Sequence, residues 1–203
     1  MNFEIIDNTF QILVLMLAMT GSIVTACRKK NRFFLFLAGG YGCFVMGTLY
    51  YMLYLIINGK VPQVFYVAEI AWLAAYLFFL SLSLSRYKMR HSFPGVLPVA
   101  AMLITMAVIL SFRILGPSLI FSFCFAVIQG ILVLRSTESL IIKKQGRLLD
   151  GLMVAVVWLQ STLYIVSIFV KDYRSFNLYF AVDILLTLML AAMLPVLGKE
   201  VDL

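Results

Sequence analysis

Seven long apolar stretches divide this chain, and they leave it little choice of fold. Each is close to the roughly 20 residues that a helix needs to cross a hydrocarbon core about 30 Å thick. Backbone polar groups in hydrocarbon need partners within the protein, so we expect helices; the alternating pattern of a membrane β-barrel is missing. The stretches cover about residues 10–27, 33–57, 64–85, 93–112, 117–134, 148–170 and 176–197.

The composition agrees with a polytopic, all-α membrane protein. The chain is 64% hydrophobic and 12% charged, too apolar for a soluble domain, and no segment between the apolar stretches is long enough to fold alone. We therefore expect one membrane domain over residues 1–203, with the lipid bilayer as its main partner, in a bacterial cytoplasmic membrane. Glu4 and Asp7 precede the first stretch without any basic residue, the reverse of a signal peptide, so we expect a mature chain.

The basic residues fall mainly on one side of the predicted bundle. Twelve flank one set of helix ends and four the other, which by the positive-inside rule places the N-terminus outside and the C-terminus in the cytoplasm. The net charge of +7 is therefore explained by topology and anionic lipid, and we expect no nucleic-acid partner. The four outer basic residues are Lys60, Arg113, Lys171 and Arg174.

Metal and thiol chemistry have no sequence support. Cys27, Cys43 and Cys124 are scattered in the apolar stretches without metal-ligand spacing, and His91 is the only histidine. We expect no cofactor and no metal site.

The chain contains an internal repeat at an offset of 114 residues. Shifted by this offset without a gap, Gly47–Tyr76 falls on Ser161–Leu190, and the matches fall on polar, aromatic and charged positions such as Glu69 on Asp183. The repeat predicts a three-plus-one-plus-three order. Repeat one spans about residues 10–85, a linker helix 93–112, and repeat two 117–197.

Glu69 and Asp183 are acids within predicted membrane helices. Such residues cost about 2.5–3.5 kcal/mol at the bilayer centre and usually face the bundle interior, where they serve function. We expect both to line one pocket near the outer surface; the alternatives are structural bonds to tyrosines, or a Glu69 that reaches interfacial water. Acids with aromatic rings suit a cationic or polyhydroxyl small molecule. The predicted ligand-binding residues are Thr48, Tyr50, Tyr54, Glu69, Trp72, Tyr76, Gln160, Thr162, Tyr164, Asp183 and Thr187.

Two families resemble this pattern. The helix order is similar to that of the SWEET sugar transporters and their PQ-loop relatives, although the first stretch lacks their helix-breaking proline. Gly47-Thr48 and Ser161-Thr162, within a likeness from Phe33 to Leu194, resemble the lysoplasmalogenase-like (YhhN-type) membrane proteins. That resemblance implies catalytic aspartates where this chain has Thr48 and Thr162. A retinal protein is excluded, because no predicted helix contains a lysine.

We therefore expect a small-solute carrier with an intramembrane pocket. A ligand-sensing or accessory subunit that acts through a protein partner or a second copy is one alternative. A lysoplasmalogenase-like hydrolase, with Glu69 and Asp183 supplying acid–base chemistry, is the other.

Overall fold

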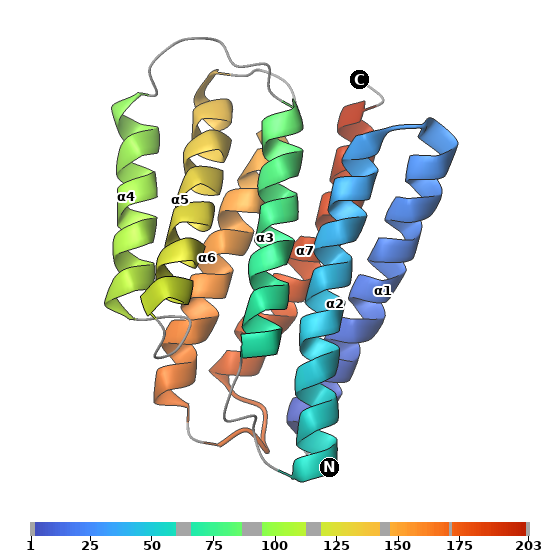
Figure 1. Ribbon diagram of the computed structural model, residues 1–203, viewed down its shortest axis with the longest axis vertical. Coiled ribbons are helices and arrows are strands. Elements are labelled where there is room, and N and C mark those ends of the chain that lie inside the picture. The colour runs from blue at the N-terminus through green and yellow to red at the C-terminus, as the bar shows by residue number, and fades with distance from the viewer. Residues whose placement is uncertain are drawn as a thin grey trace.

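The structure is a computed structural model that describes residues 3–59, 66–86, 95–112, 119–142, 147–170 and 172–201. These residues form seven α-helices and no strand (Figure 1). The helices are α1 (Phe3–Lys29), α2 (Arg32–Asn58), α3 (Tyr66–Arg86), α4 (Val96–Ser111), α5 (Leu119–Ile142), α6 (Arg147–Phe169) and α7 (Leu178–Val201). The expected all-helical class is thus confirmed, and six of the seven helices, all except α4, are long and apolar enough to cross a membrane.

The ends of α2 follow from its local sequence. The Asn31 side chain accepts a hydrogen bond from the Phe33 amide at 2.9 Å, which satisfies one of the free N–H groups of the first turn. At the other end Gly59 adopts the left-handed conformation, with φ of 63°, and its N–H reaches the Leu55 carbonyl at 2.9 Å. The expected helix break at Asn58-Gly59 is therefore confirmed, while Lys60 and Pro62 lie outside the described residues.

Two helices extend further than the apolar stretches suggested. We placed the start of the first helix near Phe10, but α1 begins at Phe3. We expected Pro195 to end or kink the last helix; α7 does not end there but continues to Val201. Both extensions bring acidic residues into the bundle that hydropathy alone assigns to its outside.

Six helices form a closed ring, and α4 stands outside it. In the order α1, α2, α3, α5, α6 and α7, each helix contacts the next, and α7 contacts α1. α4 packs mainly on α5 (Figure 1). With 16 residues, α4 is only about 24 Å long at 1.5 Å per residue. Large apolar side chains such as Leu17, Met46 and Leu188 are exposed along the outer faces of the ring, as contact with lipid requires.

Glycines let α2 and α3 approach closely. A β-carbon built at Gly40 would overlap the ring of Phe79, and one at Gly39 would lie 2.7 Å from the ring of Phe78. Small residues at such positions are typical of helix packing in membranes, where backbones come together by van der Waals contact. At Gly47 the missing side chain makes room for the Trp72 indole, whose Nε1 would lie 2.9 Å from a β-carbon there.

A buried ion cluster joins four helices at the end of the bundle where α3 and α7 finish, which we call the C-terminal end. Arg86 on α3 contacts Asp150 on α6 at 3.2 Å and also pairs with Glu200 on α7. Asp150 is fully buried and accepts a hydrogen bond from Ser139 on α5, and Glu200 accepts one from the Leu149 amide. We expected Asp150 to be an N-terminal charge near Arg147; it is also a buried partner of Arg86.

Gly40→Ala tests the close packing of α2 on α3. Its methyl group would overlap Phe79, which is buried, so we expect a loss of about 1–3 kcal/mol, the usual cost of overpacking a core. Thermal unfolding of the purified protein in detergent measures the change. Gly198→Ala on α7 is the matched control, because no atom lies within 4 Å of its added β-carbon. Equal melting temperatures for the two variants would contradict this packing.

Arg86→Met tests the ion cluster. It leaves Asp150 and Glu200 without their shared cation, and breaking a buried ion pair on one side typically costs about 3–5 kcal/mol. The control is Arg135→Gln, because the Arg135–Glu138 pair on α5 is partly exposed and such pairs contribute about 1 kcal/mol or less. If both variants unfold at the same temperature, the cluster is not what holds this end together.

Candidate functional site

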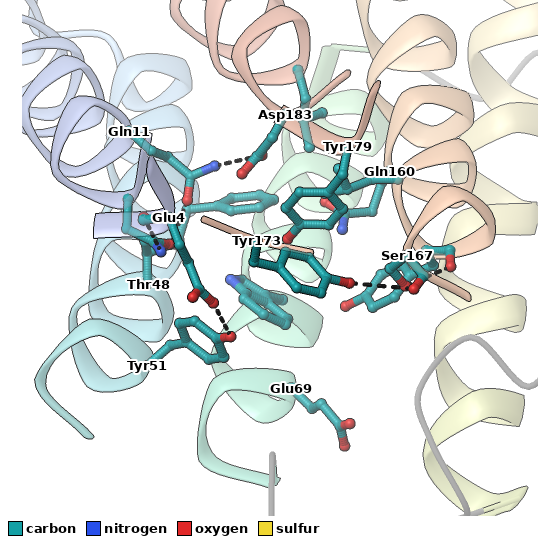
Figure 2. A pocket seen from close by; sticks show the side chains of 16 residues that line it. Glu4, Gln11, Thr48, Tyr51, Glu69, Gln160, Ser167, Tyr173, Tyr179 and Asp183 are labelled. Carbon is teal, nitrogen blue, oxygen red and sulfur yellow. Dashed lines mark hydrogen bonds between the residues drawn. The ribbon is translucent and has the colours of Figure 1, made fainter. Parts of the chain in front are cut away.

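A cavity of about 320 Å³ lies at the opposite end of the ring, where α1, α3 and α7 begin, which we call the N-terminal end (Figure 2). Its walls come from α1, α2, α3, α6, α7 and the segment between α6 and α7. The described lining residues include three acids, six aromatic side chains and several amides and hydroxyls, but no Lys, Arg or His. They are Glu4, Asn8, Gln11, Phe44, Thr48, Tyr51, Glu69, Trp72, Gln160, Leu163, Tyr164, Ser167, Tyr173, Tyr179, Asp183 and Leu186.

The first turns of α1 carry a buried polar stripe. Glu4, Asp7 and Gln11 recur at the helical spacing of three to four residues and continue the apolar stripe of Leu15 and Ala18 on the same face. The stripe is held in place because the Phe3 amide donates to the Arg174 carbonyl at 3.2 Å. Sequence reasoning missed Glu4 and Asp7 because they lie before the apolar stretch, and Gln11 because it is a single polar residue at the start of that stretch. The helical spacing of the three residues is the signal that identifies them.

Gln11 connects three helices through one amide group. Its Nε2 donates to Asp183 Oδ1 at 3.0 Å and to Thr187 Oγ1 at 3.2 Å, and its Oε1 accepts from Thr48 Oγ1 at 2.5 Å. Asp7, which precedes Gln11 by one helical turn on the same face of α1, is buried but does not line the cavity. The expected isolated acid on α7 is therefore part of a network that spans α1, α2 and α7.

Tyr51, and not Tyr50, is the tyrosine that faces the cavity from α2. Its hydroxyl donates to Glu4 Oε1 at 2.7 Å, which joins α2 to α1 at the N-terminal end of the bundle (Figure 2). Tyr50 and Tyr54 contact each other, with ring centroids 6.3 Å apart, and neither lines the cavity. Successive helical residues point about 100° apart, so an error of one residue changes the face.

Glu69 lines the cavity from the first turn of α3. Its side chain is buried, with only 7% of the residue exposed, yet it makes no hydrogen bond or ion pair within the part of the chain that the structure describes. In Figure 2 Glu69 lies apart from Glu4 and Asp183, with the rings of Tyr173 and Tyr179 between Glu69 and Asp183 in this view. The two predicted acids thus share one cavity but occupy different walls.

Aromatic rings form the remaining wall. Trp72 packs edge-on against Tyr164 with ring centroids 6.4 Å apart, and the buried Tyr164 hydroxyl has no hydrogen-bond partner among the described residues. Behind them the Tyr76 hydroxyl lies 3.4 Å from Gln160 Oε1.

The segment between α6 and α7 closes the aromatic wall. Asp172 accepts hydrogen bonds from the Arg174 amide and the Ser175 hydroxyl, both at 2.9 Å, and these bonds lower the pKa of its exposed carboxyl group. The ordered turn places Tyr173 over the cavity, where its hydroxyl donates to the Ser167 carbonyl at 3.2 Å. Sequence reasoning did not identify Tyr173, because a loop carries no periodic pattern.

The predicted site residues divide into three groups. Thr48, Glu69, Trp72, Gln160, Tyr164 and Asp183 line the cavity. Tyr76 and Thr187 lie behind the lining and bond to Gln160 and Gln11. Tyr50, Tyr54 and Thr162 lie elsewhere; Thr162 is exposed, and its hydroxyl donates to the Trp158 carbonyl of its own helix at 2.8 Å.

The described residues contain no group of three or more His, Cys, Asp or Glu side chains placed to hold a metal ion. The carboxylates of the cavity are instead distributed around its walls. A molecule with several separated polar groups matches this distribution better than a single metal ion, which needs its ligands converging on one point.

No protein-family model, curated protein or solved structure matches this chain. Its class therefore follows from the fold and the cavity. The chain is a helical bundle with six helices able to cross a membrane, as expected of an integral membrane protein, and it has an acidic, aromatic cavity at one end.

Gln11→Leu tests the network around the cavity. It keeps the size of the side chain but leaves Asp183, Thr48 and Thr187 each with one hydrogen bond fewer, and an unsatisfied buried polar group costs about 1–3 kcal/mol. We expect a clear drop in melting temperature in detergent. Thr162→Val is the control, because it removes a hydroxyl that bonds only within its own helix. A Gln11 variant as stable as this control would show that the network does not hold α1 in the ring.

Proposed function

We propose that the protein is a membrane carrier that binds a small cation in the cavity near the outer membrane surface. All seven helices span the bilayer in this proposal, with the N-terminus outside and the C-terminus in the cytoplasm. The single observation that carries it is the cavity itself, which three carboxylates and six aromatic side chains line and whose described lining has no basic residue.

The distribution of charge supports the orientation. Among the described residues, the C-terminal end of the bundle carries a basic cluster at Arg28, Lys29 and Arg32, together with Arg147 and Lys199. At the N-terminal end the described residues include one basic side chain, Arg174. Basic loops are retained in the cytoplasm, so the cavity would face outward.

The helix contacts support two related halves. α2 contacts both α1 and α3, and α6 contacts both α5 and α7. The last helix of each triple contacts the first helix of the other triple. Arg86 and Glu200, which pair across the bundle, are separated by 114 residues, the offset of the sequence repeat. Two halves that are related by rotation about an axis along the membrane normal would meet at equivalent positions in this way.

A cation is the ligand that the cavity chemistry favours over a polyhydroxyl compound. Carboxylates in a site without basic residues gain most from a positive partner, because hydrogen bonds between charged groups are stronger than neutral ones. The faces of Trp72, Tyr173 and Tyr179 add attraction for a cation that lies against them.

A carrier is favoured over a sensor because the two ends of the ring differ. The N-terminal end holds the cavity, while at the C-terminal end the buried ion cluster joins α3, α5, α6 and α7. A binding site accessible from one side and closed on the other corresponds to one state of an alternating-access cycle. Release on the other side would require the ion cluster to separate.

Uptake into proteoliposomes tests the proposal. We expect saturable uptake of radiolabelled tetramethylammonium, a permanent cation that crosses lipid poorly, and little uptake of labelled mannitol. Glu69→Gln should reduce uptake at low substrate concentration at least tenfold, because it removes a charge that has no other partner in the described chain. Glu138→Gln, which lies at the C-terminal end beside Arg135, is the matched control.

Other outcomes distinguish the alternatives. Binding of tetramethylammonium without uptake would replace the carrier by a ligand sensor. Saturable uptake of mannitol alone would make the ligand polyhydroxyl. Absence of binding for both solutes would contradict the proposed function.

A further inference from the structure

Carboxylates stand on two separate walls of the cavity. Glu4 and Asp183 belong to α1 and α7, which contact each other in the ring, whereas Glu69 belongs to α3, which α2 separates from α1. Figure 2 shows the same separation, with Glu69 pointing away from the Glu4 and Asp183 side chains. Among the described residues, no three of these acids are placed to hold a single ion.

The two walls also differ in how their charges are satisfied. Glu4 accepts a hydrogen bond from Tyr51, and Asp183 accepts one from Gln11. Glu69 has no such partner among the described residues, although it is more than nine-tenths buried and lines the cavity. The Glu69 oxygens are not among the fully buried polar atoms that lack a hydrogen-bond partner, so they keep accessible surface. A cationic ligand could therefore pair with Glu69 without displacing an existing hydrogen bond.

The surface between the two walls is apolar and aromatic. Phe44, Leu163 and Leu186 lie among the tyrosine and tryptophan rings, and the volume of about 320 Å³ is at the lower end for small-molecule pockets. Such a surface suits a short chain of methylene groups. A single divalent metal ion does not fit, because it could not reach carboxylates on both walls.

We propose that the ligand is a short linear diamine, which places one ammonium group at Glu69 and the other at the wall of Glu4 and Asp183. This inference rests on the proposed cation-binding function and adds the number and spacing of the charges. Alkyl ammonium groups resemble the lysine side chain, whose pKa is about 10.4, so both ends of such a molecule are charged at neutral pH.

Fluorescence titration of the purified full-length protein tests the inference. Trp72 lines the cavity, and the second tryptophan, Trp158, is partly exposed on α6, so Trp158→Phe makes the emission report on the cavity alone. The probes are 1,5-diaminopentane, 1-aminopentane and pentane-1,5-diol at constant ionic strength. We expect the diamine to bind at least tenfold more tightly than the monoamine, and the diol to bind most weakly.

Variants on each wall give the decisive comparison. In Glu69→Gln the affinity for the diamine should fall to that for the monoamine, because the second ammonium group no longer meets a charge. Glu4→Gln on the opposite wall keeps an oxygen that accepts from Tyr51, and it should reduce the preference for the diamine in the same direction. Glu138→Gln should leave the preference unchanged. Melting temperatures confirm that each variant is folded.

Equal affinity for the monoamine and the diamine would overturn the diamine inference while leaving the cation-binding function intact. A preference for the diamine that survives both Glu69→Gln and Glu4→Gln would also overturn it. If neither amine binds, or if the diol binds best, the proposed function fails together with the inference.

Discussion

The Gln11 amide is the interaction on which the N-terminal half of the bundle depends. Helices in lipid gain little from hydrophobic burial against one another, so polar contacts and close packing decide how they associate. Gln11 satisfies hydroxyls on α2 and α7 and the carboxylate of Asp183 at once. This network holds α1 against both neighbours, and it orients Glu4 beside Tyr51 at the mouth of the ring. The shape of the cavity follows from where these polar groups must meet.

The two halves of the chain share a layout but not their polar groups. In the register that matches Glu69 with Asp183, Asp7 and Gln11 fall on Phe121 and Phe125. Phe125 is buried against Tyr76 and Tyr164. One acid therefore lies in a hydrogen-bonded network on the α1 side, whereas the other faces rings and has no described partner. The walls that these two acids occupy therefore differ in chemistry.

The sequence allowed the helices and about half of the site to be predicted, for physical reasons that differ between residues. Glu69 and Asp183 were recognisable because an acid facing lipid is costly, and Trp72 and Gln160 because they share a helical face with an acid or a tyrosine. Glu4 and Asp7 were missed because hydropathy excludes the polar first turns of a helix from its apolar stretch, and Gln11 because a single amide among apolar residues barely changes the hydropathy of the stretch. The choice between Tyr50 and Tyr51 depends on the rotation of α2, which packing at Gly40 and Gly47 sets and composition does not.

Buried acids have different kinds of partner at the two ends of the ring. At the C-terminal end, Arg86 supplies the positive charge for Asp150 and Glu200, and the cluster is complete within the chain. At the N-terminal end, tyrosine and glutamine donors satisfy single oxygen atoms of the acids, but the described lining offers no positive charge. A protein interior retains uncompensated carboxylates only where water, protons or a ligand neutralise them. The absence of an internal cation from this lining is therefore the feature that separates a binding site from a structural ion pair within the same bundle.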